Sequence, residues 1–320
     1  MGTTRCAAFE RTPSGRTLFV NSCGKRRDGM RLLLTGAGGF LGSRLLFFYR
    51  KKYEIWAPSR GELDLTDPKA VRSGVCSFKP DVVVHCAAIS DVGTCEKNPE
   101  LSLAVNVQGT RNLAAACAPD GALCARPKFL FCSSDQVYFD GPAEGKYGMN
   151  FFAHQENEIL HPIPVYGQHK LLAEQACRSL CPDSVILRLS WMYGELTEKE
   201  RGKGRQNLGE ILRQMAREDL EWPFSDGDYR GVTDVWEVVR HLETALSLPP
   251  GIYNFGSPNS VSLYETARRA LKPFGKEKLA CPAGGNRPRN LCMDPAKALE
   301  HGIRFSDTAL GLSGFLRAGI

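Results

Sequence analysis

Tyr166 and Lys170 stand four residues apart in residues 165–174, a segment predicted to open a helix. Side chains at this spacing share one helical face. A lysine ammonium beside a tyrosine lowers the pKa of the phenol from about 10, so the phenol can donate a proton to a developing alkoxide. Ser133 and Ser134 lie at the end of a predicted strand at residues 128–135, where a serine hydroxyl can hold a carbonyl oxygen. These three residue types predict carbonyl reduction.

The stretch at residues 31–42, RLLLTGAGGFLG, indicates a nucleotide site. Three consecutive leucines are typical of a strand buried on both faces of a parallel sheet, and a glycine turn and a helix follow. In this arrangement Gly36, Gly39 and Gly42 let a pyrophosphate approach the backbone N–H groups at the helix start. Glycines also serve tight turns for steric reasons, and a Tyr–Lys pair is common on helix surfaces. The succession of strand, turn, helix and Tyr–Lys pair favours the catalytic interpretation.

The helix after the glycine turn is predicted to bury Leu41, Leu45 and Phe48 on one face. A second strand is predicted at residues 53–58. An NAD enzyme usually has an acid just beyond this strand to bind the ribose 2′-hydroxyl, whereas a basic residue there suits a 2′-phosphate. Arg60 occupies this place, so the sequence favours NADP over NAD, with a solvated turn arginine as the alternative.

A third buried strand is predicted at residues 80–88, and its small end residues Ala87 and Ala88 leave room for a ligand across the sheet. His85 lies in the apolar run, so we expect a packed core histidine. Asp67 and Pro68 predict the start of a helix, as N-cap and first helical residue.

Two further elements leave alternatives open. A helix is predicted at residues 99–116, with apolar positions at Leu101, Ala104, Val105 and Leu113. Asn106 within it either bonds neighbouring backbone near a cofactor or is an ordinary polar position. One strand is predicted at residues 185–194, and Trp191 near its end either stacks on a base or sugar ring or closes the core.

The chain has 320 residues, of which 42% are hydrophobic, and its formal net charge is +6. Six basic and two acidic side chains lie in residues 1–29, so the remainder carries only two of the net positive charges, which argues against a nucleic-acid surface. We expect residues 1–29 to be a disordered basic tail or a mis-assigned start, ahead of Met30, rather than an organellar transit peptide.

Other patterns in the sequence argue against a membrane protein and a metal-binding protein. No apolar run of about 18 residues occurs, so we expect no membrane span. The twelve cysteines are scattered without paired CxxC motifs, which predicts no metal site and reduced, mostly buried thiols in a cytoplasmic protein.

We predict a Rossmann-like doubly wound parallel sheet at residues 30–190. Residues 191–320 are predicted to form a smaller, mainly C-terminal substrate-binding lobe, with segments returning to the sheet.

These residues together resemble the extended short-chain dehydrogenase/reductases, from Met30 nearly to the C-terminus. The general marks are the glycine turn and the Tyr–Lys pair. The resemblance is greatest to the dTDP-4-dehydrorhamnose reductase branch, on the following segments: Asp64-Leu65-Thr66-Asp67, His85-Cys86-Ala87-Ala88, Ala104-Val105-Asn106-Val107-Gln108-Gly109-Thr110, Ser133-Ser134-Asp135-Gln136-Val137-Tyr138, Ser190-Trp191-Met192-Tyr193-Gly194 and Arg287-Pro288.

The resemblance implies roles for particular residues. Ser134, Tyr166 and Lys170 would be catalytic, with the last two also binding cofactor, and Ser134, Asp135 and Trp191 would bind the nucleotide-sugar. The residues lining the cofactor would include Phe40, Leu41, Asp64, Leu65, Ala87 and Ala88.

This sequence departs from the branch at four places. Ser134 replaces the more usual threonine and keeps the hydroxyl, so the chemistry should survive. Gln136 stands where a tyrosine is common, Gly93 replaces an acid, and Val232-Thr233 replaces Pro-Thr. These three departures leave the identity of the sugar open.

The implied reaction is NADPH-dependent reduction of C4 in a 4-keto-6-deoxy nucleotide-sugar, with NAD as the alternative cofactor and a homodimer left open. An epimerase or dehydratase of the same superfamily is one rival. A non-catalytic regulatory subunit, like the beta subunit of methionine adenosyltransferase, is another, because that subunit keeps similar motifs.

Overall fold

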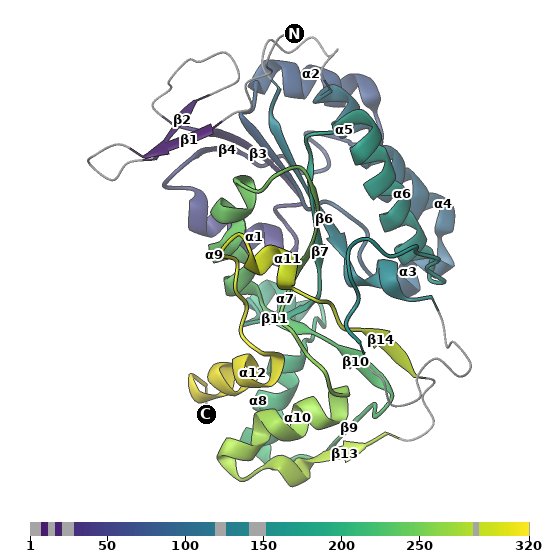
Figure 1. Cartoon of the computed structure of the whole chain (residues 1–320), viewed down its shortest axis with the longest axis vertical. Coiled ribbons are helices and arrows are strands. Elements are labelled where there is room, and N and C mark those ends of the chain that lie inside the picture. Colours follow the sequence, from purple (N-terminus) through teal and green to yellow (C-terminus); the bar gives the residue numbers. More distant parts are fainter. Residues whose placement is uncertain are drawn as a thin grey trace. The chain divides into compact units, whose positions relative to one another are not determined.

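The computed structural model divides the chain into two compact units, each built from segments far apart in the sequence (Figure 1). Unit 1 comprises residues 1–133, 164–187 and 242–252, and unit 2 comprises residues 134–163, 188–241 and 253–320. The predicted boundary between residues 190 and 191 stays a prediction. The structure describes residues 8–11, 17–20, 29–118, 126–140, 152–283 and 288–319.

Six strands, most of whose residues belong to unit 1, form the central sheet in the order β12-β7-β6-β5-β3-β4. The strands are β3 (Arg31–Thr35), β4 (Glu54–Trp56), β5 (Val82–His85), β6 (Lys128–Ser134), β7 (Val185–Leu189) and β12 (Gly251–Phe255). β3 pairs in parallel with β4 and β5, and β5 pairs in parallel with β6. The strand order therefore reverses between β3 and β5, and such a reversal is where open α/β sheets bind ligands. The predicted fold class is confirmed.

Helices cover the sheet of unit 1 (Figure 1). α2 (Pro68–Phe78), α5 (Gly109–Ala116) and α6 (Val165–Leu180) lie side by side along one face, and α1 (Phe40–Tyr49) lies on the other. α2 starts as predicted, because the Asp67 side chain accepts from the backbone N–H of Lys69 and of Ala70.

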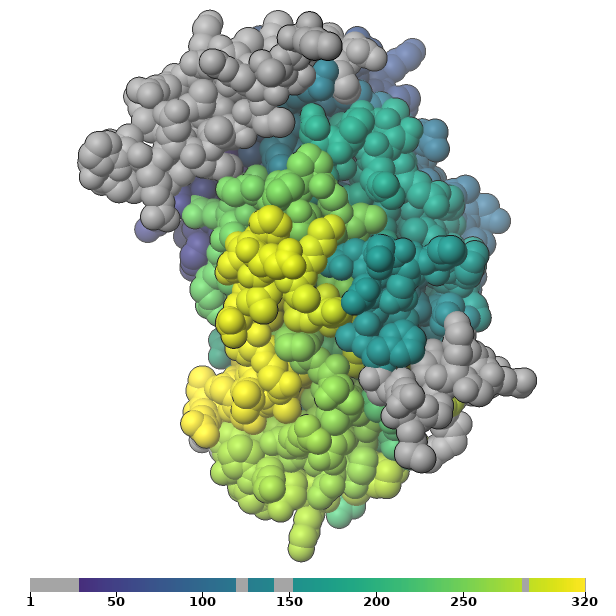
Figure 2. Space-filling view, in the orientation of Figure 1, coloured from purple at the N-terminus to yellow at the C-terminus, as the bar shows by residue number. Residues whose placement is uncertain are grey.

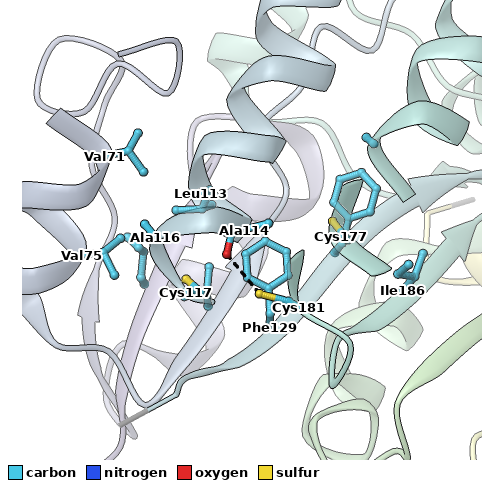
Figure 3. Close-up of a cluster of buried hydrophobic side chains, with 14 of the residues drawn as sticks. Val71, Val75, Leu113, Ala114, Ala116, Cys117, Phe129, Cys177, Cys181 and Ile186 are labelled. Carbon is cyan, nitrogen blue, oxygen red and sulfur yellow. Dashed lines mark hydrogen bonds between the residues drawn. The ribbon is translucent and has the colours of Figure 1, made fainter. Parts of the chain in front are cut away.

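The core of unit 1 lies between the sheet and α2, α5 and α6 (Figure 3). Its buried side chains include Val71, Val75, Leu113, Ala114, Ala116, Cys117, Phe129, Cys177, Cys181 and Ile186. The Cys181 thiol donates to the Ala114 carbonyl oxygen over 3.1 Å, as Figure 3 shows. The three cysteines fill the core as small apolar residues do.

Two predictions, one of a helix face and one of a strand, are wrong in detail. Leu41 and Leu45 of α1 are buried, but Phe48 is 49% exposed, because the helix turns it away from the sheet. The strand predicted at residues 185–194 is two strands, since β7 ends at Leu189 and β8 (Trp191–Tyr193) pairs with β11 (Val232–Asp234) in unit 2.

The helix predicted at residues 99–116 is interrupted by a π-helical segment, η1 (Leu103–Gln108), between α4 (Pro99–Ser102) and α5. Asn106 lies in this segment and bonds the backbone after β5. Its Nδ2 donates to the Ile89 carbonyl oxygen over 3.0 Å, and its Oδ1 accepts from the Ile89 N–H over 2.8 Å. The first of the two roles left open for Asn106, bonding to neighbouring backbone, is the one observed. A short helix, α3 (Val92–Lys97), precedes α4.

The described residues of unit 2 form three small parallel sheets. β8 pairs with β11, β9 (Trp222–Phe224) with β13 (Ala280–Pro282), and β10 (Asp228–Arg230) with β14 (Arg289–Leu291). Its helices include η2 (Asp135–Tyr138), α7 (Glu198–Gly202), α8 (Leu208–Glu218), η3 (Lys272–Phe274), η4 (Glu277–Leu279), α10 (Leu263–Leu271), α11 (Ala296–Leu299) and α12 (Thr308–Arg317). α10 and α12 pack against each other, and both reach the surface on the face drawn in Figure 2. A further helix, α9 (Val235–Leu246), runs from residues of unit 2 into residues of unit 1.

Near the N-terminus, β1 (Ala8–Arg11) and β2 (Thr17–Val20) pair antiparallel. The rest of residues 1–28 lies outside the described residues, so the expectations for residues 1–29 stay predictions. Among the helices of the described ranges, none has the length and apolar character needed to span a membrane.

Leu113→Ala should lower the free energy of unfolding by about 2–5 kcal/mol, because Leu113 is fully buried and its truncation leaves a cavity. Leu310→Ala is the control, since Leu310 is 72% exposed and its truncation should change stability by less than about 0.5 kcal/mol. Urea unfolding of the full chain measures both. Equal losses in the two variants would contradict this account of the core.

Candidate functional site

The turn between β3 and α1 accepts only glycine at two positions. Gly36 has φ +74°, and a Cβ there would lie 2.6 Å from the Ala87 nitrogen, at the exit of β5. A Cβ on Gly42 would lie 2.2 Å from the Gly36 carbonyl oxygen. Gly39 is the N-cap of α1, and no side chain in the described part of the chain caps this helix. The first N–H groups of α1 are where the sequence predicts that a pyrophosphate binds.

Four of the residues that the resemblance predicts to line the cofactor lie at the start of α1 and after β5. Phe40 and Leu41 begin α1 and are buried, and Ala87 and Ala88 follow β5 and are half-buried.

His85 is buried, and its ring nitrogens bond the hydroxyls of Thr35 (2.6 Å) and Thr110 (2.9 Å). Burial lowers the pKa of His85 to about 3, and so the ring is neutral. The prediction of a core histidine is confirmed.

The loop after β4 carries Arg60, predicted to bind a ribose 2′-phosphate, and Asp64 and Leu65, predicted to line the cofactor. Arg60 is exposed on it. Hydrogen bonds from the Thr66 side chain and backbone to the Asp64 carboxylate lower the pKa of Asp64, so this acid is ionised. The Leu65 carbonyl oxygen accepts from Asn112 Nδ2 over 2.9 Å, which ties the loop to α5. An exposed arginine on an anchored loop suits a 2′-phosphate.

Tyr166 and Lys170 come together in the first two turns of α6, and both are buried. Lys170 Nζ lies 5.9 Å from the Tyr166 ring centroid and 4.7 Å from the Phe131 ring centroid, and it donates to the Cys132 carbonyl oxygen over 2.8 Å. Burial lowers the pKa of Lys170, while the thiols of Cys132 and Cys86 oppose this. A cation so placed stabilises a phenolate.

Ser134 and Asp135 lie at the end of β6, in unit 2. Ser134 Oγ donates to Asp135 Oδ1 over 3.0 Å and accepts from the Gln136 N–H, so it caps η2. Asp135 is 3% exposed, and its Oδ2 has no hydrogen-bond partner among the described residues. Burial raises the pKa of Asp135, against the charges of Arg230 and Arg289. An unpartnered buried carboxylate oxygen is costly, and a ligand hydroxyl would satisfy it.

A charged cluster beside Asp135 was not predicted. Asp228 on β10 forms ion pairs with Arg230 (3.3 Å) and with Arg289 on β14. Arg230 also stands over the ring of Trp191, with 5.7 Å between guanidinium carbon and centroid. The sequence signal was weak: Arg289 follows the Arg-Pro motif, but nothing in the sequence joins it to residues 228–230, which come close only through the pairing of β10 with β14.

The predicted site residues therefore fall into two groups, one in each unit. Unit 1 holds the glycine turn, the Arg60 loop, Tyr166 and Lys170. Unit 2 holds Ser134, Asp135 and the 38% exposed Trp191. Among the residues described, no cluster of three or more His, Cys, Asp or Glu side chains suits a metal.

The parallel sheet, the glycine turn and the Tyr–Lys pair on α6 define an extended short-chain dehydrogenase/reductase. Within this class, the chain belongs to the family described as "RmlD substrate binding domain", whose model matches residues 30–308. The resemblance drawn from the sequence is confirmed.

One named relative agrees with this assignment, and two solved structures share the fold. The dTDP-4-dehydrorhamnose reductase of Aggregatibacter actinomycetemcomitans is 32% identical over 299 residues, which cover 87% of this chain and 95% of that protein. A solved dTDP-4-dehydrorhamnose reductase from Bacillus anthracis str. Ames, in complex with NADP, matches with a TM-score of 0.75 and 23% identity, over 92% of this chain and 100% of that one. The UDP-glucose 4-epimerase of Thermotoga maritima matches with a TM-score of 0.70 and 21% identity, over 90% and 98%. The two structures share the fold of this chain.

Gly36→Ala should weaken NADPH binding at least tenfold, because its Cβ would collide with the backbone at Ala87 and its φ is positive. Gly38→Ala in the same turn is the matched control, since nothing lies within 4 Å of a Cβ there. Fluorescence titration of each purified variant with NADPH measures the affinities. Equal affinities would contradict the steric account of the turn.

Asp135→Asn should raise the free energy of unfolding near pH 7 by about 0.5–2 kcal/mol, since a neutral amide replaces a buried carboxylate. Because the pKa of Asp135 is raised in the folded state, the gain should be small below the unfolded value of about 3.9 and grow as the pH rises through the folded value.

Asp228→Asn is the comparison for this prediction, because it removes ion pairs with Arg230 and Arg289 and should destabilise. Thermal unfolding of both variants between pH 4 and pH 8 provides the measurement. A loss of stability in Asp135→Asn at every pH would be the contrary result.

Proposed function

We propose that this protein reduces the C4 ketone of a 4-keto-6-deoxy nucleotide-sugar with NADPH. The observation that carries the proposal is the pairing of Tyr166 with the buried ammonium of Lys170 on α6, in the unit that also holds the glycine turn. A relative that spans nearly the same length is a dTDP-4-dehydrorhamnose reductase. The first substrate to test is therefore dTDP-4-dehydrorhamnose.

The residues support a dinucleotide in this role. Gly36 and Gly42 leave space where a Cβ would clash, the start of α1 presents N–H groups, and Arg60 offers a cation for a 2′-phosphate. When bound, the reduced nicotinamide supplies the hydride that reaches C4. The preference for NADPH over NADH rests on Arg60 and on the relative solved with NADP.

The protein's own groups would manage the proton and the carbonyl oxygen. Ser134 donates a hydrogen bond to the ketone oxygen and so favours the charge that develops there. Tyr166 donates its phenolic proton to that oxygen, which completes the hydroxyl group, and solvent then reprotonates the phenolate. The charge of Lys170 would stabilise the phenolate that remains, and Lys170 would hold the nicotinamide ribose.

Substrate recognition would come from unit 2. Asp135 Oδ2 accepts no hydrogen bond from the described residues, and a sugar hydroxyl could donate one to it. Trp191 is 38% exposed and offers an aromatic face for a base or sugar ring.

A cytoplasmic location and a homodimer stay predictions.

Tyr166→Phe should lower kcat by about 10²–10⁴-fold, because the proton donor is lost. NADPH affinity should stay within a few-fold, since the ring remains. Oxidation of NADPH by dTDP-4-dehydrorhamnose, followed at the nicotinamide absorbance, measures the rate, and Tyr264→Phe on α10 is the matched control.

Two results would overturn the proposal. Full activity in Tyr166→Phe would remove the tyrosine from the mechanism. Isomerisation or dehydration of the nucleotide-sugar without net NADPH oxidation would assign the protein to the epimerases or dehydratases instead.

A further inference from the structure

Two cysteines face each other at the ends of neighbouring strands in unit 1. β5 and β6 are parallel, with His85 opposite Phe131, so the next residues, Cys86 and Cys132, are adjacent across the sheet. Their Sγ atoms are 3.4 Å apart and share a hydrogen bond. Neighbouring strands lie about 4.8 Å apart, within the range of about 4.4–6.8 Å between the Cα atoms of a disulfide. A small movement would join the two sulfurs.

The surroundings of the pair favour reactivity. The hydrogen bond shared with Cys86 lowers the pKa of Cys132 against the effect of burial, and the positive charge of Lys170 lowers it further. The same hydrogen bond, together with burial, raises the pKa of Cys86. A thiolate stabilised by a nearby cation is the reactive form of cysteine.

The other buried thiols differ from this pair. Burial raises the pKa of Cys117, Cys177, Cys181 and Cys292 above the ordinary value, and buried neutral thiols react slowly. Cys86 is the partly exposed residue of the pair, whereas Cys132 is buried.

Both cysteines touch groups that belong to the candidate cofactor site. The Cys132 carbonyl oxygen is the acceptor for Lys170 Nζ. The carbonyl carbon of Cys86 lies 2.7 Å from where a Cβ on Gly36 would be, so the glycine turn rests on the Cys86 backbone. A bond of about 2.05 Å between these sulfurs, now 3.4 Å apart, would therefore join the backbone beneath the glycine turn to the backbone that accepts from Lys170.

We propose that Cys86 and Cys132 are an oxidative modification site, which closes to a disulfide in the presence of a peroxide and thereby weakens dinucleotide binding. The effect on binding rests on the dinucleotide site of the proposed function, whereas formation of the disulfide does not.

The chemistry needs only the two thiols and hydrogen peroxide. One thiol attacks the O–O bond, its sulfur gains a hydroxyl as a sulfenic acid, and one water leaves. The sulfur of the second thiol then displaces that hydroxyl, which leaves with the thiol proton as a second water. Two thiols and one peroxide thus give one disulfide and two waters, and a dithiol reductant reverses the change.

The test uses the full chain with Cys6, Cys23 and Cys124, which lie outside the described residues, replaced by serine. Stoichiometric hydrogen peroxide is added, remaining thiols are blocked, and the peptides are mapped by mass spectrometry. The expected result is a peptide crosslink between Cys86 and Cys132. The Kd for NADPH should rise at least tenfold and return to its starting value with dithiothreitol.

Two variants provide controls. Cys86→Ser should form no crosslink, and its NADPH affinity should not respond to peroxide. Cys281→Ser removes another partly exposed cysteine and should behave as the parent does. A crosslink between other cysteines, sulfinic acid at Cys86 without a crosslink, or a crosslink that leaves NADPH affinity unchanged would each overturn the proposal.

A separate outcome distinguishes this inference from the proposed function. If the reduced protein binds NADPH and loses it on oxidation, but reduces no 4-keto nucleotide-sugar, the inference stands and the proposed reaction fails.

Discussion

The buried ammonium of Lys170 fixes how α6 lies against β6 in unit 1. A cation removed from water is costly unless other groups replace its hydration, and burial does lower the pKa of this one. The replacement comes from β6, through the Cys132 carbonyl oxygen and the Phe131 ring, and both contacts require β6 and α6 to keep one spacing. Tyr166 lies one turn earlier on α6, so the position of the proposed proton donor is set by how the lysine is accommodated.

Short sequence patterns predicted those features that depend only on residues close together in the chain. The glycine turn, the Asp67 cap and the buried His85 follow from short patterns, and each is found as expected. The contacts that join distant segments were missed, because no pattern within the chain pairs Cys86 with Cys132, or residue 228 with residue 289. The roles assigned to Ser134 and Asp135 came from the family resemblance, and the structure adds the unmet carboxylate oxygen of Asp135.

Helical periodicity also failed for a physical reason at residues 99–116. A π-helical turn takes in one residue more than an α-helical turn, so every position beyond it is rotated by about 100° relative to an uninterrupted helix. Leu101 and Leu103, before or at the start of this turn, are each 45% exposed, while Leu113 beyond it is fully buried. No single apolar stripe could therefore describe both parts.

The same π-helical segment limits which changes in length the chain can absorb. Losing one residue from η1 would restore regular helix and carry Asn106 away from Ile89, so the backbone that follows β5 would lose both of its amide contacts. Substitutions on the exposed side of the segment leave that geometry intact, whereas insertions and deletions do not. In an alignment of related chains, a gap of one residue within 103–108 would therefore mark proteins whose β5 exit is held by some other means.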